Sequence, residues 1–239
     1  MKLVLLDMFD TAVSVNSLDF YDGLKGIWEK YFKDICTYDE MREFGMELYP
    51  EILATKKEYE EVSFAKDEFP RFCEHFGLDH GPLSQEDETE FRLGMSDVTF
   101  LDETRDLLEC LKEKGIPVCI LSNACTSAIS LRGLLKSVGA DEYFERVFSS
   151  SDFGLKKPAT EYFDYAVTEM AKKYPGLTKD DIVYIGDDYV LDATGGSRAG
   201  IKTFWLNRKG EENVDNLPIE IVSDMKAFKE TIINDTNVK

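Results

Sequence analysis

The chain has 239 residues, of which 43% are hydrophobic, so it can bury a core without disulfides or structural metals. Its formal net charge of -19 repels phosphate backbones and anionic lipid, which argues against nucleic acid and membrane partners. No apolar stretch approaches the roughly 20 residues of a membrane helix. Asp7 also interrupts the N-terminal run before a signal-peptide core can form. We therefore expect a cytoplasmic protein.

Along most of the chain, short apolar runs alternate with helical patterns. The runs are bounded by polar residues, which is typical of buried parallel strands, and they cover 3–6, 117–121, 182–185, 203–206 and 219–222. The helical patterns cover 101–114, 126–138, 159–173 and 224–233. This alternation predicts a three-layer, Rossmann-like α/β core with a parallel sheet.

Residues 14–96 break the alternation. This stretch is rich in aromatic and acidic residues, has helix-like apolar spacing over 20–31 and 41–48, and contains few β-branched residues. We interpret it as an inserted, mostly helical cap over the carboxyl edge of the sheet. Residues 1–13 and 97–239 then form the catalytic core.

Polar residues follow three of the predicted strands. Asp7, Ser122 and Asp187 each stand where an apolar run ends. Because ligands bind at the carboxyl ends of the strands in an open parallel sheet, these side chains should meet at one rim. The two histidines of the chain lie far from these positions in sequence, so we predict neither a histidine-based triad nor a zinc site.

Four segments around these positions resemble, in order and spacing, the four motifs of the haloacid dehalogenase-like superfamily. They are 7–11 (DMFDT), 121–123 (LSN), 157–158 (KP) and 186–192 (GDDYVLD). The resemblance runs through the core to beyond Gly200, and the insert sits where one subfamily carries a helical cap. It implies a hydrolase that acts on a small molecule.

The resemblance also implies a role for each motif residue. Asp7 would be the nucleophile, and a carboxylate needs no general base because it is already ionised at neutral pH. Thr11 and Ser122 would hydrogen-bond the ligand or the nucleophile. Asn123 would contribute to substrate binding, and Lys157 would neutralise the nucleophile and the group that is transferred.

The same resemblance implies a Mg²⁺ site, since this ion prefers oxygen ligands and keeps several waters. Its protein ligands would be Asp7, Asp187 and the backbone carbonyl of Phe9. Asp192 would coordinate through water or orient Lys157. Asp188 either supports the metal ligands or caps a helix.

Phe9 departs from the family pattern. Phosphatases of this superfamily usually have a second aspartate there, which protonates the leaving group and then activates water. Asp10 is an alternative acid, although a strand-to-loop turn would direct it elsewhere.

The leading hypothesis is a Mg²⁺-dependent phosphatase that acts on a small phosphorylated molecule through an aspartyl-phosphate intermediate. An alternative is a 2-haloacid dehalogenase-like enzyme, because those enzymes resemble this chain in having an aromatic residue at the position of Phe9. They use no metal, however, and tend to have tyrosine where this chain has Phe163. Arg42 is a candidate for binding a substrate carboxylate in that case. A catalytically weak binding or regulatory protein is the third hypothesis.

Overall fold

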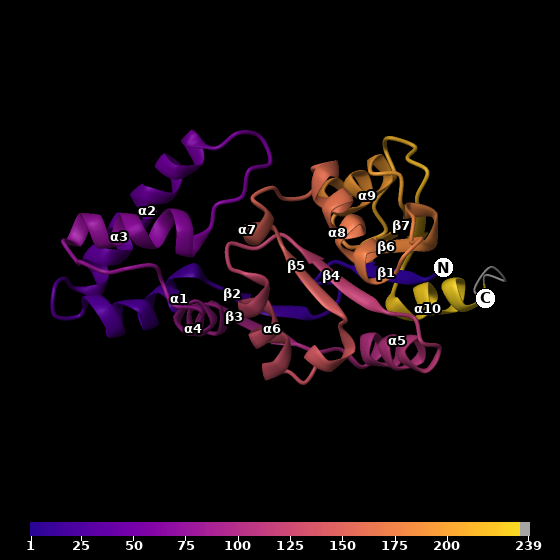
Figure 1. The fold of residues 1–239 in the computed structure, drawn as a ribbon, viewed down its shortest axis with the longest axis horizontal. Coiled ribbons are helices and arrows are strands. Elements are labelled where there is room, and N and C mark those ends of the chain that lie inside the picture. The colour runs from indigo at the N-terminus through magenta and orange to yellow at the C-terminus, as the bar shows by residue number, and fades with distance from the viewer. Residues whose placement is uncertain (235–239) are drawn as a thin grey trace.

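The computed structural model describes residues 1–234. Its core is built on a six-stranded parallel sheet (Figure 1). The strand order is β5-β4-β1-β6-β7-β8, and every neighbouring pair is parallel. The bounds are β1 Leu3–Leu6, β4 Val118–Ser122, β5 Arg146–Ser149, β6 Ile182–Gly186, β7 Lys202–Leu206 and β8 Glu220–Val222. This confirms the predicted Rossmann-like α/β core.

Helices cover both faces of the sheet, with α5 and α10 on one side and α8 and α9 on the other (Figure 1). The core helices are α5 Asp102–Glu113, α6 Ala128–Ser137, α7 Ser150–Phe153, α8 Thr160–Lys173, α9 Gly195–Arg198 and α10 Met225–Asn234. Single turns are η3 Asp141–Tyr143, η4 Lys179–Asp181 and η5 Tyr189–Thr194. No helix of the described part, 1–234, has the length and apolarity needed to cross a membrane.

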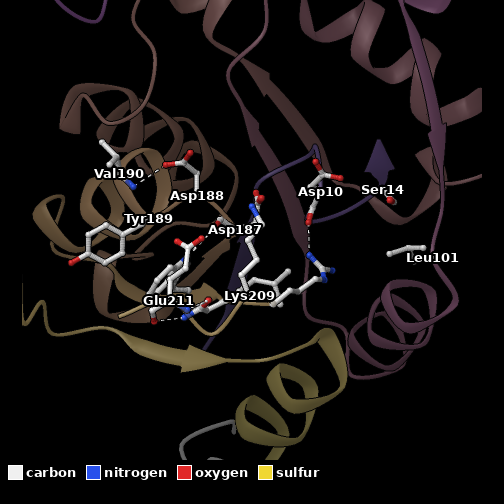
Figure 2. A pocket seen from close by; sticks show the side chains of 13 residues that line it. Asp10, Ser14, Leu101, Asp187, Asp188, Tyr189, Val190, Lys209 and Glu211 are labelled. Atoms are coloured by element: carbon white, nitrogen blue, oxygen red, sulfur yellow. Dashed lines mark hydrogen bonds between the residues drawn. The ribbon is translucent and has the colours of Figure 1, made fainter. Parts of the chain in front are cut away.

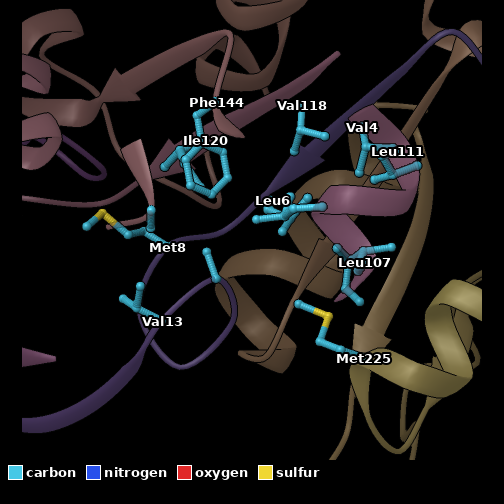
Figure 3. Close-up of a cluster of buried hydrophobic side chains, with 14 of the residues drawn as sticks. Val4, Leu6, Met8, Val13, Leu107, Leu111, Val118, Ile120, Phe144 and Met225 are labelled. Carbon is cyan, nitrogen blue, oxygen red and sulfur yellow. The ribbon is translucent and has the colours of Figure 1, made fainter. Parts of the chain in front are cut away.

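Strand β1 supplies both apolar layers because successive side chains of a strand point to opposite faces. Val4 and Leu6 pack with Leu107 of α5 and Met225 of α10, as Figure 3 shows. Leu3 and Leu5 belong to the opposite layer, against α8. The sequence around β1 therefore places the strand, and the residue that follows it, at the centre of the molecule.

The stretch between β1 and α5 forms a separate helical layer with its own aromatic core. Its helices are α1 Phe20–Ile27, η1 Trp28–Phe32, α2 Tyr38–Thr55, η2 Phe64–Glu68, α3 Phe69–Phe76 and α4 Gln85–Met95. We call residues 14–96 the cap. The chain leaves and re-enters the core through an antiparallel ribbon of β2 (Ser14–Leu18) and β3 (Ser96–Thr99), which we did not predict. Strand β5 was not predicted either.

Candidate active site

Three carboxylates converge where β1 and β6 end. Asp7 follows β1 directly, and its backbone N–H donates to the carbonyl of Ile185 in β6 at 2.9 Å. Asp187 follows β6, and Asp192 lies in η5. One carboxylate oxygen from each of Asp7, Asp187 and Asp192 lies within 4.8 Å of the other two. The neighbouring order β4-β1-β6 thus brings the predicted rim residues Asp7 and Asp187 together and places Ser122 at the end of the adjoining strand β4.

Lys157 joins two of these carboxylates. Its Nζ lies 2.5 Å from Asp7 Oδ1 and 2.6 Å from Asp192 Oδ1, and its side chain is only 2% exposed. It also donates to the hydroxyl of Tyr184 at 3.2 Å. Burial alone would lower the pKa of Lys157, but Asp192 and Asp7 outweigh it and hold that pKa above its usual range. The lysine therefore stays a cation beside the proposed nucleophile.

Asp192 is fully engaged by protein donors. Its Oδ1 accepts from Lys157 and from the hydroxyl of Tyr184, and its Oδ2 accepts from the backbone N–H of Asp188 at 3.0 Å. The carboxylate lies against Gly186, where an added Cβ would be 2.3 Å from Asp192 Cγ. Sequence reasoning missed Tyr184, and it quoted Gly186 within the fourth motif without giving it a role. The only signal was a phenol within an apolar run that ends in glycine.

Asp187 is held by Thr11, whose hydroxyl donates to Asp187 Oδ1 at 3.3 Å. Burial, and then the neighbouring carboxylates of Asp192 and Asp10, raise the pKa of Asp187 to about 6. Burial raises the pKa of Asp7 to about 7; Lys157 opposes this rise, while Asp192 and Asp187 add to it. A cation between Asp7 and Asp187 would relieve this repulsion and favour both ionised forms.

Asn123 positions the backbone of Lys157. Its Oδ1 accepts from the Lys157 N–H at 2.8 Å, and its Nδ2 donates to the Lys157 carbonyl at 3.0 Å. Ser122 is completely buried, and Tyr162 donates to its carbonyl at 3.0 Å. These contacts fix the loop after β4 against the lysine, so Asn123 has a structural task in addition to its predicted contact with substrate.

Asp188 caps a helix, which was one of its two predicted roles. It is exposed, and its Oδ1 accepts from the backbone N–H groups of Val190 and Leu191 at 2.8 and 2.7 Å. Side-chain oxygens commonly satisfy the first N–H groups of a helix in this way. Asp187 and Asp188 are therefore adjacent carboxylates in different environments.

Asp10 is a turn residue with a φ of 54°. Aspartate tolerates this left-handed conformation better than most side chains, and glycine adopts it freely, which accounts for the glycine often found here in the family that the motifs resemble. Its Oδ1 accepts from Val15 N–H at 2.9 Å, and its carbonyl accepts from Arg208 at 2.5 Å. Asp10 and Asp187 line one cavity of about 560 Å³, shown in Figure 2.

Phe9 lies half-buried in the same turn, packed against the apolar layer of α5 and α6. The guanidinium carbon of Arg92, from α4 of the cap, lies 5.7 Å from the centre of its ring. Neither Phe9 nor Arg92 is able to act as a proton donor and acceptor in turn. The position two residues after Asp7 thus carries no side chain that could first protonate a leaving group and then accept a proton from water.

Comparison with known proteins agrees with this architecture. Residues 1–200 match the family model of haloacid dehalogenase-like hydrolases. The chain is 26% identical to the pyrimidine 5'-nucleotidase PynA of Streptococcus pneumoniae, over 89% of this chain and 86% of that protein. It is 28% identical to an (S)-2-haloacid dehalogenase of Pseudomonas fluorescens, over 68% of this chain and 67% of that protein.

The fold also has solved counterparts. The crystal structure of a 2-haloacid dehalogenase from Pseudomonas syringae matches with a TM-score of 0.67 at 20% identity, over 98% of both chains. At such identity the likeness concerns the fold alone. The family model, by contrast, spans both the nucleophile loop and the loop after β6, with the motif residues in order. This chain belongs to the haloacid dehalogenase-like hydrolases.

Proposed function

We propose that the protein is a Mg²⁺-dependent phosphatase that cleaves a small phosphorylated molecule through an aspartyl-phosphate on Asp7. The observation that supports this most is the charge of the site. Three carboxylates of Asp7, Asp187 and Asp192 face one ammonium of Lys157, so two negative charges are left over when all are ionised. A divalent cation neutralises such a site, and hard oxygen donors suit Mg²⁺.

The available donors fit one ion. Both oxygens of Asp192 are occupied by protein groups, which leaves Asp7 and Asp187 as the carboxylates to hold it. The carbonyl of Phe9 is the third proposed ligand. When bound, the ion supplies positive charge against the phosphoryl oxygens, which lowers the repulsion that an attacking carboxylate meets.

The residues of the chain supply the remaining chemistry. A carboxylate oxygen of Asp7 attacks phosphorus, the bond from phosphorus to the leaving oxygen breaks, and its electron pair stays on that oxygen. Lys157 keeps Asp7 oriented and balances part of the charge. Water then attacks the phosphorus of the aspartyl-phosphate, which releases phosphate and restores the carboxylate.

A panel of phosphate esters, assayed with Mg²⁺ and with a chelator, tests this proposal. We expect phosphate release that the chelator abolishes. Asp187→Asn should lose Mg²⁺ affinity in calorimetry and most of the activity, whereas Asp188→Asn, next to it on the helix cap, should keep both. Phosphate release that persists in the chelator, or equal losses in the two variants, would contradict the metal site.

A dehalogenase is the second candidate, and Phe9 is the observation that favours it. Halide leaves without being protonated, so the missing acid would not matter. The 28% identity to the Pseudomonas fluorescens enzyme points the same way. Adding 2-haloacids to the panel separates the two functions: halide release that is indifferent to the chelator, with no phosphate release, would favour the dehalogenase.

A further inference from the structure

Arg92 is a buried cation without an acidic partner among the residues that the structure describes. Its side chain belongs to α4, and the residue is 2% exposed. The guanidinium donates to the hydroxyls of Thr126 at 2.8 Å and Ser96 at 3.3 Å, and to the sulfur of Cys125 at 3.5 Å. All three partners are formally neutral groups, and a guanidinium offers five donors.

Such an arrangement is costly in an isolated protein. Buried charges are normally paired, because moving an ion out of water without a counter-charge costs several kcal/mol. An arginine has no escape through deprotonation, since it stays protonated in proteins. The buried Lys157 illustrates the usual solution, with two carboxylates at hydrogen-bond distance. None of the described acidic residues therefore pairs with the positive charge of Arg92, and an anion from outside the chain would balance it.

The guanidinium also contacts the two loops that follow Asp7 and Ser122. It stands between two loops: Phe9 is two residues beyond Asp7, and Cys125 is three residues beyond Ser122. The cap closes onto the second loop at the same place, where the N–H of Phe64 donates to the carbonyl of Cys125 at 2.8 Å. An anion bound to Arg92 would thus lie on the cap side of the nucleophile, where the leaving group of a substrate must extend.

We propose that Arg92 is a specificity-determining residue that binds a second anionic group, a carboxylate or a phosphate, on the leaving part of the substrate. The inference rests on the proposed phosphatase function and narrows its substrates to small molecules with two anionic groups. A guanidinium suits this task because its planar fork holds carboxylate and phosphate oxygens in pairs.

Matched ligands test the inference. Phosphoglycolate and ethyl phosphate differ by a carboxylate in place of a methyl group, and propane-1,3-diol bisphosphate and propyl phosphate differ by a second phosphate. Calorimetry with Mg²⁺ measures their dissociation constants, and inhibition of nitrophenyl phosphate hydrolysis gives an independent value. The wild type should bind at least one doubly anionic ligand at least about tenfold more tightly than its matched partner.

Arg92→Met should remove this preference and leave the binding of ethyl and propyl phosphate within about twofold. Arg92→Lys should retain part of it. Arg42→Met is the matched comparison, because Arg42 is an exposed arginine of the same cap that also contacts an aromatic ring, Tyr21, and the sequence made it the competing candidate for binding a carboxylate. This variant should keep the preference.

Three results would overturn the inference. The first is equal affinity of the wild type for the two ligands of a matched pair. The second is an equal loss of affinity for both ligands of a pair in Arg92→Met, as expected if Arg92 only holds the cap in place. The third is loss of the preference in Arg42→Met while Arg92→Met keeps it. Preferential binding without any phosphate release would support the anion site while refuting the phosphatase proposal. Hydrolysis of phosphate esters without a preference for doubly anionic ligands would support the phosphatase proposal and refute the anion site.

Discussion

Glu68, in the cap, provides a test of how the protein tolerates a buried acid. The residue is 2% exposed, and no donor among residues 1–234 hydrogen-bonds its carboxylate. Burial, and then the neighbouring carboxylate of Asp67, raise the pKa of Glu68 to about 8. Tyr21, Tyr49 and Cys125 are the titratable groups of the surrounding elements that interact with it.

The sign of the pH effect follows from this shift. The folded protein binds the Glu68 proton more tightly than the unfolded chain, whose pKa is 4.5. The stability that the neutral carboxyl contributes is therefore complete below pH 4.5, and it is lost as the pH rises towards 8. Each pKa unit corresponds to about 1.4 kcal/mol, and the titration is only partial near pH 5 and near pH 8, so the loss between these two pH values is about 3 kcal/mol.

Glu68→Gln removes this titration while keeping the shape of the side chain. The free energy of unfolding, measured in urea at pH 5, 6, 7 and 8, should differ little between variant and wild type at pH 5. By pH 8 the variant should be more stable by about 3 kcal/mol. Glu43→Gln, on the exposed face of α2, controls for the loss of one surface charge. A difference that stays constant across this pH range would refute the reasoning.

Two further substitutions probe the core. Phe9→Asp should supply a proton donor, so the rate of hydrolysis of alkyl phosphates should rise by up to about 10²-fold while that of nitrophenyl phosphate changes little. Measurement of kcat/KM for both kinds of ester checks this, and an equal change for the two would contradict it. Gly186→Ala should push Asp192 away from Lys157, because the new Cβ would lie 2.3 Å from Asp192 Cγ. We expect kcat to fall by at least about tenfold. An unchanged kcat would show that catalysis does not depend on the close approach of Asp192 to Gly186.

The parallel sheet and the rim of the site were predictable because their signals are local. Each apolar run ends at a polar residue, and strand ends in a parallel sheet share one edge. Asp7, Ser122 and Asp187 therefore follow from the order of the runs alone. The four predicted helices of the core begin and end within two residues of the observed ones, since apolar spacing and caps lie in the same short segments.

The ribbon and the cap contacts were not predictable in the same way. Strand β2 reads Ser-Val-Asn-Ser-Leu and pairs with β3, some 80 residues away, so no short window contains the signal. Arg92 and Glu68 look like ordinary charged residues of acidic helices. Both are buried in the folded protein, and burial is a property of the assembled fold rather than of either segment.

Two buried ionisable residues of the cap, Arg92 and Glu68, differ from Lys157 of the core in how their charge is balanced. In the core, Lys157 has two carboxylate partners, and the proposed divalent cation would balance the remaining negative charge. In the cap, Arg92 and Glu68 have no ionic partner among the described residues, although both interact electrostatically with Cys125. We therefore expect the core residues to carry the chemical step and Arg92 of the cap to contribute to the choice of substrate. Substitutions at Arg92 should therefore change KM and the choice of substrate, while those at Lys157 should lower kcat for every ester.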